Sequence, residues 1–349
     1  YVPLDPDYPP ARLAYLVADA GLTTVIGAAR LGAAGAGLAD PSLAAPAADA
    51  APLPPPDPDG VAYVLYTSGS TGAPKGVVVG HAGLARIAAA WRAAYALRPG
   101  QVHLQMASAA FDVFTGDWVR ALTSGGCLVF CPRDVLADPP ALLALLATAR
   151  VQVAEFVPAV VRGLLAEAEA RDARLPPLEL LVVGSDAWYG SEYARLRARA
   201  APGTRIVNSY GLAEATIDSS WYEAPADALP APTEAVPIGR PFAGTRLYVC
   251  DPAGELLPPG VPGELWIAGD GVALGYLGRA AETAARFRPD PLVPGARACR
   301  TGDRARLAAD GNVVLLGRTD EQFKLRGIRI EPGEVEAALA ADPRVAAAA

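Results

Sequence analysis

Histidine, methionine and cysteine are scarce in this sequence, and their scarcity excludes several kinds of active site. The 349 residues include two histidines, one methionine and four cysteines. Two histidines, His81 and His103, are too few for a histidine-rich metal site or for most Ser-His-Asp arrangements. Each could instead be a core residue or a helix cap. Cys127 and Cys131 flank an apolar run, so we interpret them as buried strand thiols of a cytoplasmic protein rather than zinc ligands.

Positive charge is also in short supply. Thirty Lys and Arg face 37 Asp and Glu, which gives a net charge of -7 and a pI of about 5.0. This balance argues against the basic surface of a nucleic-acid-binding protein. No apolar run approaches the roughly 18 residues that a membrane span needs, and no signal peptide opens the chain. We therefore expect a cytoplasmic protein without nucleic-acid or membrane partners.

Apolar residues are abundant instead. With 52% hydrophobic and 19% charged residues, the chain can build a large core, and its length predicts more than one domain. Tyr1 begins in mid-phrase without an initiator methionine, and Ala349 follows directly on a helical pattern. We expect a segment of a longer chain, truncated at both ends.

Short apolar runs alternate with helical patterns through the first two thirds of the chain. A helix is expected over 10–20, and a low-complexity loop of Ala, Pro, Gly and Asp over 31–60. The later runs are apolar on both faces, which predicts a mainly parallel sheet covered by helices. The expected strands are 61–66, 127–130, 151–157, 178–184 and 205–211, and the expected helices 81–96, 139–149, 158–170 and 191–200.

The pattern changes after about residue 236. Short strands at 245–250, 263–269 and 312–317, broken by Gly and Pro, predict a small antiparallel sheet or barrel. The stretch 324–343 then indicates a strand and a helix, with Pro332 near the helix start. Together these patterns predict an α/β protein.

The stretch LYTSGSTGAPKG (65–76) follows an apolar strand and combines glycines, hydroxyl side chains and Lys75. Glycines let backbone N–H groups approach an anion, hydroxyls donate hydrogen bonds and the lysine adds a point charge, so the loop is suited to phosphate. Pro74 and Gly76 flank the lysine, so the Walker A pattern is not matched. The alternative interpretation is a flexible polar hairpin loop.

TSGSTGAPKG resembles the phosphate-loop signature of adenylate-forming enzymes, and further phrases follow in that family's order. They are FDVFTGDW (111–118), NSYGLAEAT (208–216), GELWIAGDGVALGYL (263–277), RTGD (300–303) and GRTDEQFKLRGIRIEPGEVE (317–336). Together they most resemble the adenylation domain of a nonribosomal peptide synthetase. The resemblance implies a large AMP-binding domain with a barrel-like subdomain over 1–320, and the start of a small C-terminal α+β domain over 321–349.

The resemblance also implies a reaction and its partners. ATP with Mg²⁺ would activate an amino acid as aminoacyl-AMP, releasing pyrophosphate. The aminoacyl group would then pass to the phosphopantetheine thiol of a peptidyl carrier protein, and a neighbouring condensation domain is expected.

The family's functional residues carry over to matching positions. Glu214 would hold Mg²⁺, because a hard cation prefers a carboxylate oxygen. Tyr210 would stack on adenine, Asp303 would accept both ribose hydroxyls, and Asp320 would be the hinge. The implied catalytic residues are Lys75, Thr71, Glu214 and Arg318. The implied nucleotide-binding residues are Thr67, Ser68, Gly69, Ser70, Thr71, Gly72, Lys75, Gly184, Ser185, Asn208, Tyr210, Gly211, Asp303 and Arg318.

Simpler interpretations stand beside three of these assignments. Asp303 could be a turn residue, Glu214 an acid at a helix start, and Arg318 a solvated strand end. The sequence also departs from the family's pattern. Ala213 stands where the family usually has Thr, Leu274 stands where Arg is usual, and the chain ends before the family's essential C-terminal lysine. The chain by itself is therefore expected to be weakly active or inactive.

Asp112 is implied to pair with the α-ammonium group of an amino acid, and its alternative role is the N-cap of a helix beginning near residue 113. Glu155 shares a strand face with valines, where a carboxylate costs several kcal/mol unless it is paired; a solvent-facing strand end is the alternative. The implied substrate-binding residues are Asp112, Val113, Gly116, Glu155, Leu181, Val183, Ser209, Ile217 and Asp218.

Two acids besides Asp112, namely Glu155 and Asp218, require a second cation. The pattern resembles pockets for ornithine and, more loosely, for lysine, diaminobutyrate or arginine. Gly116 would leave room for a long side chain, whereas Val183 departs from the Gly usual in ornithine pockets. Two other functions stay open: an acyl- or aryl-CoA ligase, which these acids argue against, and a degenerate scaffold domain.

Overall fold

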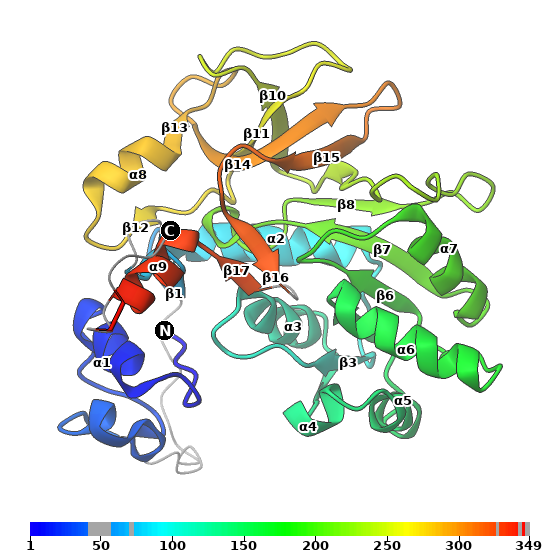
Figure 1. Ribbon diagram of the computed structural model, residues 1–349, viewed down its shortest axis with the longest axis horizontal. Helices are drawn as coiled ribbons and strands as arrows, with labels where there is room; N and C mark the ends of the chain where they lie inside the picture. The colour runs from blue at the N-terminus through cyan, green and yellow to red at the C-terminus, as the bar shows by residue number, and fades with distance from the viewer. Residues whose placement is uncertain (41–56, 70–72, 326–327, 341–343, 346–349) are drawn as a thin grey trace.

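A computed structural model describes residues 1–40, 57–69, 73–325, 328–340 and 344–345. Its largest part is a helix-flanked sheet, and a smaller group of β-strands lies against one side of it (Figure 1). The N-terminal helix lies beside the last helix of the chain, and Arg12 pairs with Glu334 across 2.6 Å. Segments far apart in the sequence therefore meet at that end of the molecule.

The largest sheet has the strand order β4-β3-β5-β6-β7-β8-β9. Strands β3 to β7 are parallel, and β8 and β9 are antiparallel additions at one edge. Its strands are β3 (Val102–Gln105), β4 (Cys127–Phe130), β5 (Val153–Phe156), β6 (Leu180–Val183), β7 (Arg205–Tyr210), β8 (Ser220–Glu223) and β9 (Arg240–Pro241). β5 and β6 are buried at every position, as the middle strands of a sheet covered on both faces must be.

Helices cover both faces of this sheet. One face packs on α5 (Pro139–Thr148), α6 (Pro158–Ala170) and α7 (Gly190–Arg199). The other packs on α2 (His81–Ala94) and α3 (Asp112–Thr123), where Trp91 and Val119 meet the valines of β5 to β7. A short α4 (Arg133–Leu136) follows β4. Alternate residues of one strand therefore enter two different cores.

Two smaller sheets adjoin the large one. An antiparallel sheet joins β1 (Val61–Thr67), β2 (Lys75–Gly80) and β12 (Gly275–Tyr276). A five-stranded antiparallel sheet is made of β10 (Thr245–Cys250), β11 (Gly263–Gly269), β13 (Phe287–Pro289), β14 (Arg297–Leu307) and β15 (Val313–Arg318). Helix α8 (Ala280–Arg286) links β12 to β13.

The remaining elements lie near the two ends and beside the large sheet. They are α1 (Pro10–Asp19), the 3-10 helices η1 (Ala28–Gly35) and η2 (Ala213–Ala215), the hairpin of β16 (Phe323–Leu325) and β17 (Ile328–Ile330), and α9 (Pro332–Ala340). Pro10, Pro158 and Pro332 each open a helix, where the missing N–H has no intrahelical partner to lose.

The predicted α/β class is confirmed, and so is the antiparallel sheet after residue 236. Two expectations were wrong. Residues 31–35 belong to η1 instead of a loop, while 41–56 lie outside the described residues. Cys127 is exposed because β4 is an edge strand, although Cys131 is buried as expected. The domain boundary at residue 320 stays a prediction.

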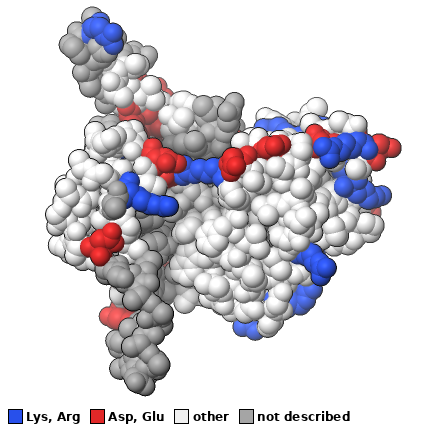
Figure 2. Space-filling model, turned by 90° about the horizontal axis from the view of Figure 1, so that it is seen from below, with Lys and Arg blue, Asp and Glu red and all other residues white. Residues whose placement is uncertain are grey.

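Figure 2 shows one face of the molecule, on which charged side chains are few, as the 19% of charged residues in the sequence leads one to expect. Lys and Arg side chains lie interspersed with Asp and Glu in a row across the upper part of this face and at its right-hand edge, and most of the described surface on that face is uncharged. Among the described residues, no helix is both long and apolar enough to cross a membrane. Nor do the described residues include a cluster of three or more His, Cys, Asp or Glu that could hold a metal ion.

The core on the α5–α7 face should dominate stability. Leu165 is fully buried there, so Leu165→Ala is expected to lower the free energy of unfolding by about 2–5 kcal/mol through lost burial and the cavity left behind. The measurement is urea unfolding of the full-length protein. Leu292→Ala is the control, because Leu292 is 60% exposed. Equal midpoints for the two variants would contradict this account of the core.

Candidate active site

The predicted site residues gather at the carboxyl ends of the parallel strands. β5, β6 and β7 end at Phe156, Val183 and Tyr210, and η2 follows directly on β7. Ligands bind at this edge in open α/β sheets because the loops that leave the strands diverge there. The β1–β2 hairpin lies nearby, since β2 and η2 are in contact.

The β1–β2 hairpin holds the predicted phosphate loop at its tip. Thr67 and Lys75 are paired across the hairpin, so both ends of the loop are fixed. The Oγ1 atom of Thr67 is buried and has no hydrogen-bond partner among the described residues. A Cβ on Gly69 would lie 2.0 Å from the carbonyl oxygen of Ala73, so this close approach requires glycine. Ser70, Thr71 and Gly72 lie outside the described residues.

Lys75 and Glu214 meet around Tyr276. The hydroxyl of Tyr276 donates a hydrogen bond to Glu214 Oε1 at 2.8 Å, and Lys75 Nζ lies 4.7 Å from the centre of the Tyr276 ring. Glu214 is fully buried, so it is no solvated acid at a helix start. Burial, reinforced by Glu214, raises the pKa of Tyr276, which keeps its hydroxyl a hydrogen-bond donor.

A cleft of about 410 Å³ opens beside this group. Its lining mixes cations and acids from β2, β11, α8, β14 and the segment after β15. The residues are Lys75, Glu264, Tyr276, Glu282, Ala285, Arg286, Arg300, Gly302, Thr319 and Asp320. The guanidinium of Arg286 is anchored by donating to the carbonyl oxygen of Thr301 at 2.9 Å. Three cations, Lys75, Arg286 and Arg300, therefore line the cleft among three acids and could contact phosphate oxygens.

Tyr210, Asp303, Arg318 and Asp320 form one connected group. The Tyr210 hydroxyl donates to Asp303 Oδ2, and Arg318 donates to Asp303 Oδ1 at 2.7 Å. Arg318 also donates to both carboxylate oxygens of Asp320, at 2.6 and 2.7 Å. Asp303 lies within β14 and pairs with Arg318, so it is no turn residue. Arg318 is the last residue of β15, but its side chain is only 17% exposed, so it is no solvated strand end. The structure thus brings the predicted ribose and hinge residues together.

The other predicted nucleotide residues border this group from β6 and β7. Asn208 donates to the carbonyl oxygen of Pro237 at 2.7 Å, and its Oδ1 accepts from Trp188, so it braces the strand end. Ser185 has a φ of 69° directly after Gly184. A Cβ on Gly211 would lie 1.7 Å from the carbonyl oxygen of Ile217, so the two backbone segments can approach this closely only with glycine at position 211.

Helix α3 presents the predicted ammonium-binding carboxylate at its first residue, Asp112. The N-cap position belongs to Phe111, so Asp112 is an acid of the first helical turn rather than the N-cap residue. Asp112 Oδ1 accepts from the backbone N–H of Val113 at 2.9 Å, and both side chains are half-buried. Gly116 follows one turn later, and a Cβ there would lie 3.5 Å from a guanidinium nitrogen of Arg120.

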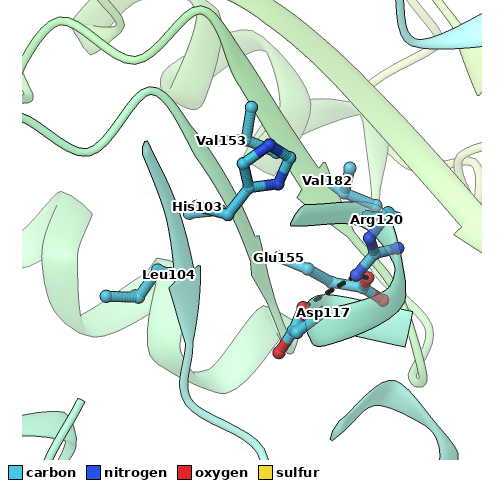
Figure 3. A pocket seen from close by; sticks show the side chains of 8 residues that line it. His103, Leu104, Asp117, Arg120, Val153, Glu155 and Val182 are labelled. Atoms are coloured by element: carbon cyan, nitrogen blue, oxygen red, sulfur yellow. Dashed lines mark hydrogen bonds and ion pairs between the residues drawn. The ribbon is translucent and has the colours of Figure 1, made fainter. Parts of the chain in front are cut away.

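Arg120 is the centre of a buried charge cluster, defined as Arg120 with Asp117, Glu155 and Asp218 (Figure 3). Nη2 of Arg120 donates to Glu155 Oε2 at 2.5 Å and to Asp117 Oδ1 at 2.8 Å. Nη1 lies 3.5 Å from Asp218 Oδ2. Glu155 is 5% exposed, so it is not a solvent-facing strand end. The cation that Glu155 and Asp218 were expected to require is therefore supplied, at least in part, by this chain.

Neighbouring side chains complete the charge cluster. Trp91 Nε1 donates to Asp218 Oδ2 at 2.8 Å, and Ser209 Oγ donates to Asp218 Oδ1 at 2.7 Å. The Arg120 guanidinium lies 4.9 Å from the centre of the Trp91 ring. The predicted residues Ser209 and Asp218 thus contact the cluster directly.

Burial governs the pKa values in the cluster. Desolvation raises the pKa of Asp117 and of Asp218, and the nearby charge of Glu155 adds to both shifts. Burial alone would lower the pKa of Arg120, but the three carboxylates together raise it above its usual value. Arg120 therefore stays charged, whereas the ionised forms of Asp117 and Asp218 are disfavoured at this buried position.

Two predicted pocket residues lie elsewhere. Leu181 and Val183 point into the core on the α5–α7 face, whereas Glu155 shares the opposite face with Val182, its register partner. Ile217 packs in the core that contains Trp91 and Val182. Thr216 and Ile217 both have positive φ angles, 59° and 71°, which are strained for β-branched residues.

Sequence reasoning missed Arg120, Trp91, Tyr276 and Arg286. A signal for Arg120 existed, because residues four apart share a helix face and Arg120 follows Gly116 at that spacing. Tyr276 lay within a recognised phrase but had no assigned role. Trp91 and Arg286 come from helices far from the motifs, and their placement depends on the tertiary fold.

The arrangement suits the binding of a polyphosphate and an amino acid side by side. Lys75, the buried Thr67 hydroxyl and the Gly69 turn fit a phosphate group, and buried Glu214 fits one carboxylate ligand of a phosphate-bound Mg²⁺ ion. Gly184, a predicted nucleotide residue, lies next to the predicted substrate residues Ser209 and Glu155. A Cβ there would lie 3.1 Å from the Ser209 carbonyl oxygen and 3.4 Å from Glu155 Oε1.

His103 offers a test of the buried environment. Burial, helped by the charge of Arg120, lowers its pKa to about 4. Between pH 6.5 and 4, His103 is then protonated in the unfolded chain and neutral in the folded chain. The free energy of unfolding should fall as the pH drops through this window, with a slope approaching about 1.4 kcal/mol per pH unit from this residue.

His103→Leu should remove that part of the slope, measured by urea unfolding of the full-length protein at several pH values. His81→Leu is the matched control and should keep it. An unchanged pH dependence in His103→Leu would contradict the burial argument.

Comparisons with known proteins agree with this geometry. The sequence profile of the AMP-binding enzyme family matches residues 1–277. Gramicidin S synthase 2 of Brevibacillus brevis is 43% identical over 347 residues, which cover 97% of this chain and 8% of that protein. This chain thus spans a small part of the curated relative that it matches.

Two solved structures share the fold. One is the Vibrio cholerae adenylation domain AlmE in complex with glycyl-adenosine-5'-phosphate, with a TM-score of 0.73 and 26% identity over 83% of this chain and 54% of that chain. The other is holo-PA1221, a nonribosomal peptide synthetase protein containing adenylation and PCP domains, with a TM-score of 0.85 and 29% identity over 99% of this chain and 60% of that chain. The chain belongs to the AMP-binding enzyme family, and its relatives are adenylation domains of nonribosomal peptide synthetases.

Proposed function

We propose that this chain is the core of a domain that activates an amino acid as its adenylate and loads it onto a carrier protein. One observation carries the proposal: the predicted nucleotide residue Gly184 lies beside Ser209 and the carboxylate of Glu155, where β5, β6 and β7 end. Such proximity lets a substrate carboxylate approach a bound nucleotide. We also propose a cytoplasmic location, where ATP is available to such a reaction.

In the proposed first step, a carboxylate oxygen of the amino acid attacks the α-phosphorus of ATP. The new C(O)O–P bond forms as the bond to pyrophosphate breaks, so negative charge shifts onto the leaving group. Lys75 and the loop N–H groups would neutralise it, and Glu214 would hold Mg²⁺ against the phosphates. Tyr210 and Asp303 would place the adenosine, with ribose hydroxyls replacing or joining the present partners of Asp303.

In the proposed second step, the phosphopantetheine thiolate of a carrier domain attacks the acyl carbon and AMP leaves. The solved relative with adenylation and PCP domains supports this type of partner. A condensation domain would then use the loaded aminoacyl group. Asp320, held by Arg318, would act as the hinge between the two steps.

We further propose that the substrate is a diamino acid, with L-ornithine the first candidate. The charge cluster contains three carboxyl groups against one guanidinium, and burial raises the pKa of Asp117 and of Asp218, so a further positive charge nearby would favour their ionised forms. Glu155 uses Oε2 for Arg120, and its Oε1 faces Gly184 at the strand ends. A side-chain ammonium at Oε1 would be a charge-assisted partner in a buried setting.

The test of activity is amino-acid-dependent exchange between ATP and pyrophosphate in the full-length protein. Asp112→Ala should lower exchange with every α-amino acid by about 10- to 100-fold, because a charge-assisted contact to the α-ammonium is lost. Asp134→Ala is the control, since Asp134 is exposed on α4. Near-normal exchange in Asp112→Ala would reject its role. A folded protein that binds ATP but exchanges with no acid would favour a scaffold function instead.

The test of substrate class uses the same assay with ornithine, lysine, arginine, diaminobutyrate, leucine and benzoate. Glu155→Ala and the shape-conserving Glu155→Gln should each lose ornithine exchange selectively, because the carboxylate that faces the second ammonium is gone. Glu234→Ala, at an exposed position, is the control. Retained ornithine preference in both Glu155 variants, or wild-type preference for leucine or benzoate, would contradict the diamino-acid proposal.

A further inference from the structure

We propose that Arg120 is a specificity-determining residue whose guanidinium closes the far end of the amino-acid pocket and so limits the length of the substrate side chain. The inference rests on the proposed function, because it names how that same site selects among basic amino acids. A short diamino acid would fit in front of Arg120, and longer cationic side chains would be excluded by it.

The helix geometry puts Arg120 in line with the pocket. Asp112, Gly116 and Arg120 are spaced four residues apart, so they lie along one face of α3. Long helical side chains point back toward the helix N-terminus, which carries the guanidinium over Gly116. Only about one turn, roughly 5.4 Å along the axis, then separates the α-ammonium partner Asp112 from the level at which the guanidinium lies.

The space that Gly116 leaves is already bounded. A Cβ on Gly116 would lie 3.4 Å from Cγ2 of Ile217, 3.5 Å from Nη2 of Arg120 and 3.5 Å from Cη2 of Trp91. The expected room for a long side chain therefore ends at the guanidinium. Shortening Arg120, rather than changing Gly116, is what would lengthen the pocket.

The guanidinium is held firmly in that position. It is paired with Asp117 on its own helix, with Glu155 on β5 and with Asp218 before β8, and it stacks on Trp91 of α2. Swinging it aside would leave three buried carboxylates without their cation, which is strongly unfavourable. A substrate cannot easily displace it, so it acts as a fixed wall.

Nothing longer fits behind the guanidinium. The cavity on that side measures about 10 Å³ and is lined by His103, Leu104, Val153, Ala154 and Val182 together with the charge cluster (Figure 3). This volume is about that of one water molecule. Substrate length is thus set in front of Arg120, where Glu155 Oε1 faces the strand ends.

The test compares Arg120→Ala and Arg120→Lys with wild type in ATP–pyrophosphate exchange on the full-length protein. In Arg120→Ala the kcat/KM ratio of arginine to ornithine should rise about tenfold or more, because the substrate's own guanidinium can replace the deleted one. Free guanidinium at low concentration should reverse this gain. In Arg120→Lys, which keeps the charge on a shorter side chain, the ratio of lysine to ornithine should rise. Arg195→Ala, in a surface ion pair on α7, is the control and should change neither ratio.

The outcomes separate the two proposals. Absence of amino-acid-dependent exchange in the wild type would reject the proposed function itself. Wild-type exchange with unchanged ratios in a folded Arg120 variant would reject the role of Arg120 alone. Thermal unfolding would show whether the variants fold. Loss of folding in both Arg120→Ala and Arg120→Lys would give Arg120 a purely structural role and would also overturn the inference.

Discussion

The balance of buried charge around Arg120 is the constraint on which this site depends. Three carboxylates from α3, β5 and the segment before β8 share one guanidinium in an interior lined by valines and Trp91. Each charge loses its hydration there, and only mutual pairing makes the arrangement tolerable. Because the partners come from separate elements, the cluster fixes how α3 sits on the sheet, and therefore where Asp112 lies.

The second half of the site depends on contacts between sheets. The β1–β2 hairpin brings Lys75 to Tyr276 of β12. The hydroxyl of Tyr276 in turn donates to Glu214 of η2, which follows the last parallel strand of the large sheet. The five-stranded sheet contributes Asp303, which Tyr210 reaches from β7. The strained backbone at Thr216 and Ile217 lies between these two halves, where tertiary contacts must hold it. A nucleotide and an amino acid can therefore be oriented by rigid elements rather than by loops alone.

Much of the fold could be predicted from local pattern. The α/β rhythm, the helix starts at proline and the later antiparallel sheet all follow from periodicity and turn residues. β14 was missed because Arg300, Gly302 and Asp303 break its apolar pattern, yet it pairs with β11 on one side and with β13 and β15 on the other. The run at Ala28–Gly35 forms a 3-10 helix despite its glycines, with a kink at Gly32.

The residues of the candidate site could likewise be predicted only in part. Motif residues such as Lys75, Tyr210, Asp303 and Arg318 could be predicted because they lie in recognisable phrases, and the structure brings them together. Arg120 could not be assigned, since only the packing of α3 on β5 shows that Glu155 has a partner within the chain. Leu181 and Val183 were assigned by position alone, and strand alternation turns them to the other face.

The most direct measurement is a crystal structure of the full adenylation domain with a non-hydrolysable sulfamate analogue of ornithinyl-AMP. The account predicts adenosine beside Tyr210 and Asp303, and the side-chain ammonium within about 2.7–3.2 Å of Glu155 Oε1, in front of an unmoved Arg120. An ammonium group directed away from Glu155, or a guanidinium displaced from the pocket, would contradict it.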